Sequence, residues 1–249
     1  MQPKITVAEH AGFCFGVRRA TEQIENAIRS RKGERLFTLG HLIHNPTYLD
    51  RLEKNGVVSV TLEEGRALAA QTTEKQPARL FIRAHGIPFE TEKELSALAE
   101  QYPFFSYEDC TCPYVKKIHR IAAEYSGDGT VFVLMGDEKH PEVIGIMSYF
   151  AGEKYVFASA DELLAAEEQG RLSNLHKKTP VFAAQTTYNL TEWKKTQKIL
   201  KKLYTNSIIF DTICNVTEKR QAEARMLSSA CDAMIVIGGK ESSNTAKLA

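Results

Sequence analysis

Three cysteines are spaced almost evenly along this chain of 249 residues, at Cys14, Cys112 and Cys214. They are 98 and 102 residues apart, and each lies where an apolar run typical of a strand gives way to a pattern typical of a helix. A helix N-terminus favours the thiolate, which is the form of cysteine that binds metal. Three such cysteines indicate an iron–sulfur cluster, a zinc ion or, if they do no chemistry, three buried thiols.

Polar residues recur at matched distances after these cysteines. Two units carry one polar residue about 29 and another about 72 residues after the cysteine, and the third unit carries only the first of the two. These positions are His44 and His85, His140 and Thr186, and Ser242. A fixed period predicts repeated units that face a shared centre. The second position of the third unit would lie beyond Ala249, so we expect a third lobe that ends early.

The recurring residues are of types that bind anions and move protons. Histidines, together with the hydroxyl and amide groups of Ser242, Ser243 and Asn244, would form a pocket for phosphate or diphosphate. Glu142 follows His140 by two residues and is interpreted either as a proton donor with a raised pKa, relayed by Thr186, or as a solvated carboxylate at a helix start.

The two remaining cysteines are not expected to bind metal. Cys110 lies two residues before Cys112, and in an extended segment its side chain should point the other way. Cys231 lies in a helix-like run and is expected in the core. Five cysteines without a secretion signal argue against a disulfide framework.

Alternating patterns along the chain predict an α/β fold with parallel sheets and covering helices. Helices are expected at 17–32, 113–125 and 190–203, and buried strands at 79–84, 130–135, 180–184 and 232–238. We expect three similar lobes in a pseudo-threefold arrangement around a central cluster: 16–112, 113–210, and an incomplete third lobe of 211–249 with 1–15. Ligands of such sheets gather at the carboxyl ends of the strands, where every recurring polar residue is predicted to lie.

Composition excludes some classes of partner. Lysine and arginine number 32 against 31 aspartates and glutamates, so charge gives no reason to expect nucleic acid or an anionic membrane surface. No run of about 18 apolar residues occurs, and the N-terminus does not resemble a signal peptide. A cytoplasmic protein is expected.

Taken together, the motifs resemble those of the 4-hydroxy-3-methylbut-2-enyl diphosphate reductase family, also called LytB. The matching segments run in order from residue 12 to residue 244: GFCFGVRRA, IHNP, AHG, TCPYVKKIH, HPEVIG, QTT, TICNVTEKRQ and GGKESSN. The resemblance implies a trilobed α/β fold and reductive dehydroxylation of that allylic diphosphate to isopentenyl and dimethylallyl diphosphate, the last step of the non-mevalonate isoprenoid route. The family's third lobe continues into a further segment with a serine that grips diphosphate, which we do not find here.

The resemblance also implies a set of residue roles. Cys14, Cys112 and Cys214 would bind a 4Fe–4S cluster with one iron open to the substrate hydroxyl, and Glu142 and Thr186 would handle protons. The residues implied to hold the substrate are His44, His85, His140, Thr186, Ser242, Ser243 and Asn244. A ferredoxin or flavodoxin is implied as the electron donor. The alternatives are a zinc-dependent hydrolase or deaminase that uses His140, Glu142 and cysteines, and a non-catalytic iron–sulfur sensor.

Overall fold

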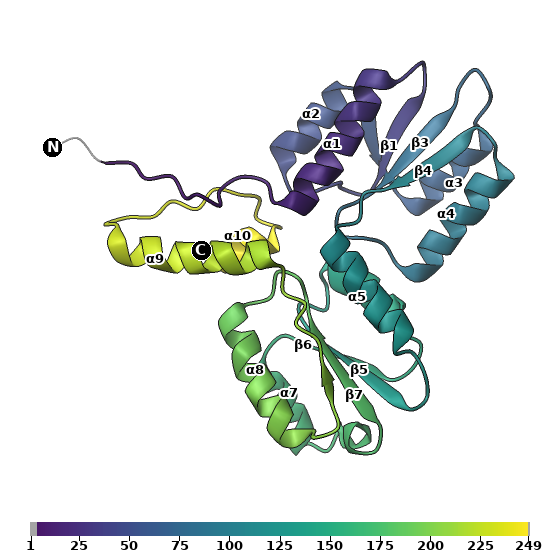
Figure 1. Ribbon diagram of the computed structural model, residues 1–249. Helices are drawn as coiled ribbons and strands as arrows, with labels where there is room; N and C mark the ends of the chain where they lie inside the picture. The colour runs from purple at the N-terminus through teal and green to yellow at the C-terminus, as the bar shows by residue number, and fades with distance from the viewer. Residues whose placement is uncertain (1–3, 249) are drawn as a thin grey trace.

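The computed structural model describes residues 4–248 as two α/β lobes and a third, helical part (Figure 1). The first lobe contains α1 (Phe15–Ser30), β1 (Arg35–Leu39), α2 (Pro46–Lys54), β2 (Val57–Val60), α3 (Leu62–Ala70), β3 (Ala78–Ile82), α4 (Phe89–Gln101) and β4 (Phe105–Asp109). The second contains α5 (Pro113–Glu124), β5 (Thr130–Met135), α6 (Pro141–Ser148), β6 (Lys154–Phe157), α7 (Ala160–Glu168), the 3-10 helix η1 (Ser173–His176), β7 (Thr179–Ala184), α8 (Leu190–Leu203) and β8 (Ile208–Ile209).

Both lobes have the same topology. The sheet orders are β2-β1-β3-β4 and β6-β5-β7-β8, and every strand pair is parallel. In the first lobe α1 and α2 pack with Phe81 on one face, while α3 and α4 pack with Leu80 and Ile82 on the other. In the second lobe α5 and α6 cover one face of the sheet, and α7 and α8 cover the other. The expected parallel sheets with covering helices are therefore confirmed for these two lobes.

The third part consists of α9 (Asn215–Ala230), α10 (Ser243–Leu248) and the N-terminal segment. The predicted strand at 232–238 is wrong: these residues are irregular, and Ile235 and Ile237 are 85% and 92% exposed. The segment before Cys14, residues 4–13, likewise contains no strand. Cys231 ends α9 and is exposed, so its expected burial is also wrong. Both apolar runs lack a partner strand within residues 4–248, and a strand is stable only when it is paired.

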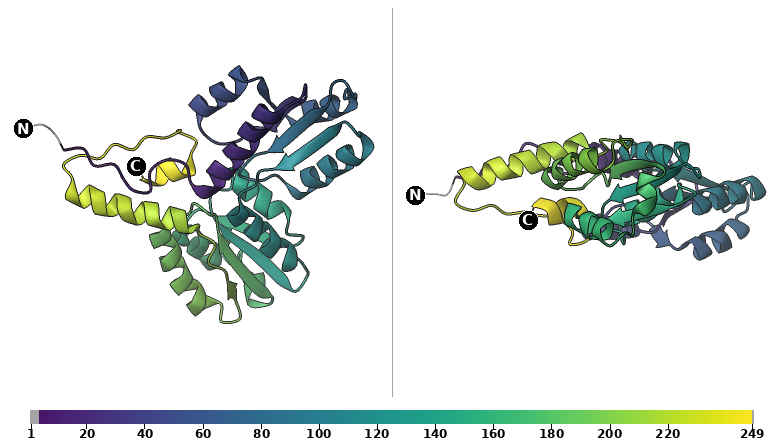
Figure 2. Two further views of the ribbon diagram at one scale, coloured as in Figure 1. Left: turned by 45° about the horizontal axis from the view of Figure 1, so that its top comes forward. Right: turned by 90° about the horizontal axis from the view of Figure 1, so that it is seen from below.

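The remaining predictions of elements hold to within a few residues. The strand at 130–135 and the helix at 190–203 coincide with β5 and α8. The proposed lobe boundaries include residues 1–3 and 249, which lie outside the described residues. No helix among the described residues is long and apolar enough to cross a membrane. Figures 1 and 2 show α1, α5 and α9 beginning near a common centre, where the three parts meet.

Candidate functional site

The three evenly spaced cysteines cap the three helices that begin at this centre. Cys14, Cys112 and Cys214 are the N-caps of α1, α5 and α9, and all three are half-buried. The Cys14 Sγ accepts a hydrogen bond from Val17 N at 3.5 Å. Backbone N–H groups in the first turns of α5 and α9 likewise face the other two thiols. All three sulfur atoms therefore lie at helix N-termini, and Cys14 accepts a cap hydrogen bond while Cys112 and Cys214 do not.

Burial, rather than the helix N-termini, sets the protonation of two of these thiols. Burial raises the pKa of Cys112 to about 11 and also raises the pKa of Cys214. The backbone donors oppose this rise but do not cancel it, so the expected thiolate is not favoured by the protein alone. Charge on Cys14 raises both pKa values further. A bound cation would supply the positive charge that thiolates require here.

The spacing of the thiols distinguishes between kinds of metal site. Within residues 4–248, three side chains of metal-binding type have ligand atoms that all lie within 4.8 Å of one another: His44, His85 and His140. The three cysteines do not meet this condition. Three sulfur atoms on one zinc ion would lie about 4 Å apart, because each Zn–S bond is about 2.3 Å long. Gly16 leaves room for the Cys112 sulfur, since a Cβ there would lie 2.5 Å from it. At least one pair of the three sulfur atoms is therefore more than 4.8 Å apart, which is wider than a single zinc ion spans.

Glu142 and Thr186 form a buried pair at the carboxyl ends of β5 and β7, the two central strands of the second sheet. Glu142 lies in the first turn of α6 and is 2% exposed, and Thr186 follows β7. Thr186 donates from its backbone N to Oε1 of Glu142 at 2.7 Å and from Oγ1 to Oε2 at 2.8 Å. Burial raises the pKa of Glu142 to about 7, the direction expected from the sequence. The alternative of a solvated carboxylate is wrong, because the group is buried.

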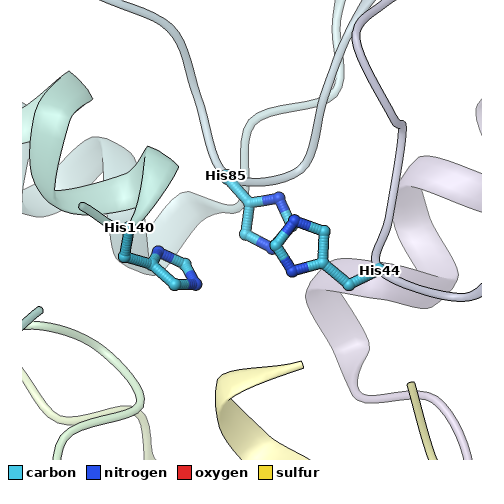
Figure 3. Close-up of side chains that lie close together, drawn as sticks. All are labelled: His44, His85 and His140. Carbon is cyan, nitrogen blue, oxygen red and sulfur yellow. The ribbon is translucent and has the colours of Figure 1, made fainter. Parts of the chain in front are cut away.

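Three histidine rings gather at the ends of β1, β3 and β5 (Figure 3). The ring centroids of His44 and His85 are 4.2 Å apart, and His140 lies 5.4 Å from His85 and 5.8 Å from His44. Burial lowers the pKa of His140 to about 4, and burial with the nearby His44 and His140 lowers the pKa of His85 well below its ordinary value. Two of the rings are therefore neutral at pH 7 until an anion enters.

Hydrogen bonds assign tautomers to two of the rings. Glu142 N donates to Nδ1 of His140 at 3.1 Å, so the proton of the neutral ring is on Nε2. The Nδ1 of His44 lies 2.7 Å from the carbonyl oxygen of Glu241 and must donate to it. Nδ1 of His85 is buried and has no hydrogen-bond partner within residues 4–248. A proton on Nε2 of His140 favours an anion over a metal ion, which needs a lone pair at that atom.

The C-terminal segment brings Glu241, which directly precedes the predicted serines, into contact with His44. Besides the contact of Glu241 with His44, Gly239 lies so close to His44 that a Cβ would be 2.6 Å from the His44 carbonyl oxygen. Ser243 begins α10 and accepts a hydrogen bond from Oγ1 of Thr187 at 2.8 Å. Ser242 and Asn244 flank Ser243, one before the helix and one in its first turn. Sequence reasoning missed Thr187, although it directly follows Thr186.

Cys110 lies outside this site. It is fully buried in the core formed by α1, α2 and the first sheet, and burial raises its pKa to about 12. The structure thus places it away from the centre where Cys112 caps α5. Cys110 is therefore interpreted as a core residue rather than as a fourth metal ligand beside Cys112.

Comparison with known proteins identifies relatives of one family. The family model described as LytB protein matches residues 5–249. A 4-hydroxy-3-methylbut-2-enyl diphosphate reductase of Caldanaerobacter subterraneus subsp. tengcongensis is 41% identical over 245 residues, which cover 98% of this chain and 78% of that protein. The reductase of Aquifex aeolicus is 35% identical over 247 residues, with coverage of 98% and 78%.

Two solved structures are similar in fold. One is (E)-4-hydroxy-3-methyl-but-2-enyl diphosphate reductase, described as the terminal enzyme of the non-mevalonate pathway; it has a TM-score of 0.69 and 34% identity and matches 98% of this chain and 80% of its own. The other, a reductase from Plasmodium falciparum, has a TM-score of 0.80 at 24% identity, with coverage of 95% and 69%, and supports the fold.

Proposed function

This chain belongs to the LytB family, and from that premise we propose that it reduces 4-hydroxy-3-methylbut-2-enyl diphosphate to isopentenyl and dimethylallyl diphosphate, the last step of the non-mevalonate pathway. The reaction breaks the allylic C–O bond, forms a C–H bond and releases water, and it consumes two electrons and two protons. The observation that carries the proposal is the meeting of three closely packed histidine rings with a buried, protonatable Glu142 beside the cysteine centre.

LytB reductases are iron–sulfur proteins, and we propose that this chain binds a 4Fe–4S cluster through Cys14, Cys112 and Cys214. The support is the donor set itself: three thiols at three helix N-caps, at least one pair of them more than 4.8 Å apart, with Gly16 leaving room for one sulfur. When bound, the cluster supplies electrons, and its iron without a cysteine ligand acts as a Lewis acid toward the substrate hydroxyl.

The histidines and the C-terminal serines hold the diphosphate. His140 presents its Nε2–H, and a bound anion raises the lowered pKa of His85, so that this ring takes up a proton and donates from both nitrogens. Ser242, Ser243 and Asn244 close the other side of the pocket. This grip fixes the hydroxyl end of the substrate near the cysteines and makes the bond cleavage effectively unimolecular.

Glu142 and Thr186 manage the protons. A carboxyl group with a pKa of about 7 holds its proton in a large fraction of molecules near neutral pH and releases it readily. The Thr186 hydroxyl, which bonds to Oε2 of Glu142, relays the proton toward the leaving hydroxyl. Burial excludes bulk water from the pair, so the proton is delivered by one defined route.

The proposal includes a setting and partners for the reaction. The chain works in the cytoplasm, where thiols remain reduced, and it receives electrons from a ferredoxin or flavodoxin. We further propose that its three lobes are bounded as expected from the sequence, at 16–112, 113–210, and 211–249 with 1–15. Nucleic acid and membrane are not partners of this reaction.

Anaerobic reconstitution with iron and sulfide, followed by metal analysis and an electron-spin spectrum, tests the proposal. We expect iron and acid-labile sulfide in equal amounts and product formation from the diphosphate with a chemical reductant. Zinc without sulfide would support a hydrolase or deaminase instead. A cluster that forms in a protein unable to bind the diphosphate would support a sensor. Either result would overturn the reductase assignment.

A further inference from the structure

Near its beginning, α1 is tied to the segment that carries the second cysteine. Arg19, five residues after Cys14, donates from Nη1 to the carbonyl oxygen of Thr111 at 3.2 Å and from Nη2 to that of Asp109 at 3.3 Å. Thr111 directly precedes Cys112 and is buried. The position of the second sulfur therefore depends on a side chain of the helix that the first cysteine caps.

A corresponding tie runs from α9 to the segment that carries the first cysteine. Arg220, six residues after Cys214, donates from Nε to the carbonyl oxygen of His10 at 2.9 Å and from Nη2 to that of Gly12. Glu223, one turn further along α9, accepts hydrogen bonds from the backbone N and Nδ1 of His10, both at 3.0 Å. Residues 4–13 contain no strand, so these hydrogen bonds hold the segment that leads into α1 in place.

The third tie runs from α5 to the last cysteine. Tyr114, two residues after Cys112, donates from its hydroxyl to Oδ1 of Asn215 at 2.9 Å. Asn215 directly follows Cys214, and the same Oδ1 lies 3.8 Å from the Cys214 sulfur. A side chain from the helix of the second cysteine thus fixes the residue next to the third.

The three ties form a closed ring. Helix α1 is bonded to the segment of Cys112, α5 to the residue after Cys214, and α9 to the segment that leads to Cys14. We propose that Arg19, Tyr114 and Arg220 are positioning residues that set the spacing of the three thiols and so retain the cluster. The inference rests on the proposed function, since it concerns the metal centre assigned there. The cysteines belong to segments about 100 residues apart, so cluster binding requires their relative positions to be fixed in advance.

Retention of iron by the reconstituted protein tests the ring. Tyr114→Phe removes a single hydroxyl, and Arg220→Ala removes two ties to the first segment. Both variants should lose iron to a chelator about 10-fold faster than the wild type, the lower limit typical of residues that orient metal ligands. Lys219→Ala and Arg18→Ala, at exposed positions adjacent to Arg220 and Arg19, are the matched controls and should lose iron at the wild-type rate.

The readouts separate positioning from general destabilisation. Each faster iron loss should be accompanied by an altered electron-spin spectrum at an unchanged thermal unfolding midpoint of the apoprotein, and Arg220→Lys should restore part of the retention through one donor. Equal iron-loss rates in Tyr114→Phe, Arg220→Ala and the controls would overturn the ring. Failure of the wild type to bind iron and sulfide would instead refute the proposed function, so the two failures are distinguishable.

Discussion

At the scale of single residues, the most informative side chain is a carboxyl group with no contact to bulk water. Glu142 is 2% exposed and accepts both of its hydrogen bonds from Thr186, which holds it in one orientation. Glu142→Gln keeps the size of the side chain and removes its exchangeable proton. The variant should keep the iron and sulfide of the wild type and lose turnover about 100-fold or more, the usual contribution of a positioned acid.

A nearby carboxylate provides the control for this prediction. Glu138 lies in the same connection between β5 and α6 but is exposed, so Glu138→Gln should change neither cluster content nor turnover. Steady-state assays under anaerobic conditions measure the difference. Near-normal turnover of Glu142→Gln would mean that the proton comes from another group.

The histidine cluster makes anion binding dependent on protons. Burial lowers the pKa of His140 to about 4 and that of His85 well below its usual value, while a bound diphosphate favours the charged rings and raises both. Binding of inorganic diphosphate should therefore be coupled to proton uptake, and the protein's contribution to affinity should increase as the pH falls from 8 to 6. Calorimetry in buffers of different ionisation enthalpy measures this uptake.

Two variants separate the protein's protons from those of the ligand. His85→Gln should take up fewer protons and bind diphosphate more weakly, because burial, together with the nearby His44 and His140, lowers the pKa of the His85 ring in the free protein. His41→Gln, at an exposed position close to His44, should behave as the wild type does. Identical proton uptake in His85→Gln and the wild type would contradict a charged histidine cluster in the complex.

At the scale of elements, the first turn of α1 is shaped by a sulfur atom of another helix. Gly16→Ala should raise the helix preference of α1 by about 1 kcal/mol. Its Cβ, however, would lie 2.5 Å from the Cys112 sulfur, so the cysteine must move away from its place. We expect markedly less bound iron after reconstitution, measured by metal analysis. Wild-type iron and sulfide content in this variant would show that the Cys112 position is not critical.

A second helical glycine isolates the effect of helix preference. Gly65 lies in α3, where an added Cβ would be 3.8 Å from Cδ2 of Leu80, an ordinary contact. Gly65→Ala should therefore keep its full iron content and raise the free energy of unfolding by up to about 1 kcal/mol. A difference between the two variants in iron content is thus caused by the sulfur contact and not by the helix.

The elements that could be predicted are those stabilised mostly by local interactions and those strands that are paired on both sides. The run at 130–135 forms β5 because neighbouring strands pair with it on both sides. The equally apolar run at 232–238 forms no strand, since pairing depends on residues far away and not on the run itself. Spacing likewise predicted where the cysteines would converge but not their protonation, because burial depends on the assembled lobes.

At the scale of the whole molecule, the repeat of about 100 residues predicted the matching topology of the two sheets. It could not predict the contacts that complete the site. Nδ1 of His44 meets the Glu241 carbonyl group across 197 residues of sequence, and Arg220 reaches Gly12 across 208. Neither contact can be recognised from residue types, because the acceptor in each is a backbone carbonyl, which every residue carries.

Burial of several neutral histidines should make the whole fold sensitive to acid. Burial lowers the pKa of His119 from 6.5 to about 4, with Asp109 opposing and Lys116 reinforcing the shift, and His140 is lowered to a similar value. The unfolded chain binds protons at these rings below pH 6.5 and the folded chain does not, so stability is lost as the pH falls from 6.5 toward 4. Each ring should remove about 2 kcal/mol from the free energy of unfolding between pH 7 and pH 5.

Urea titrations of the apoprotein at several pH values measure this loss, and one substitution assigns part of it. His119 lies in α5, its ring stacks on Tyr149, and its Nε2 is buried with no hydrogen-bond partner among the residues that the structure describes. His119→Leu therefore removes the titrating group from the core. The packing cost of the substitution is read at pH 8, where the rings are neutral. Relative to that reference, His119→Leu should lose about 2 kcal/mol less than the wild type on going to pH 5. Parallel pH profiles for the two proteins would mean that His119 is protonated in the folded state and that another group causes the acid sensitivity.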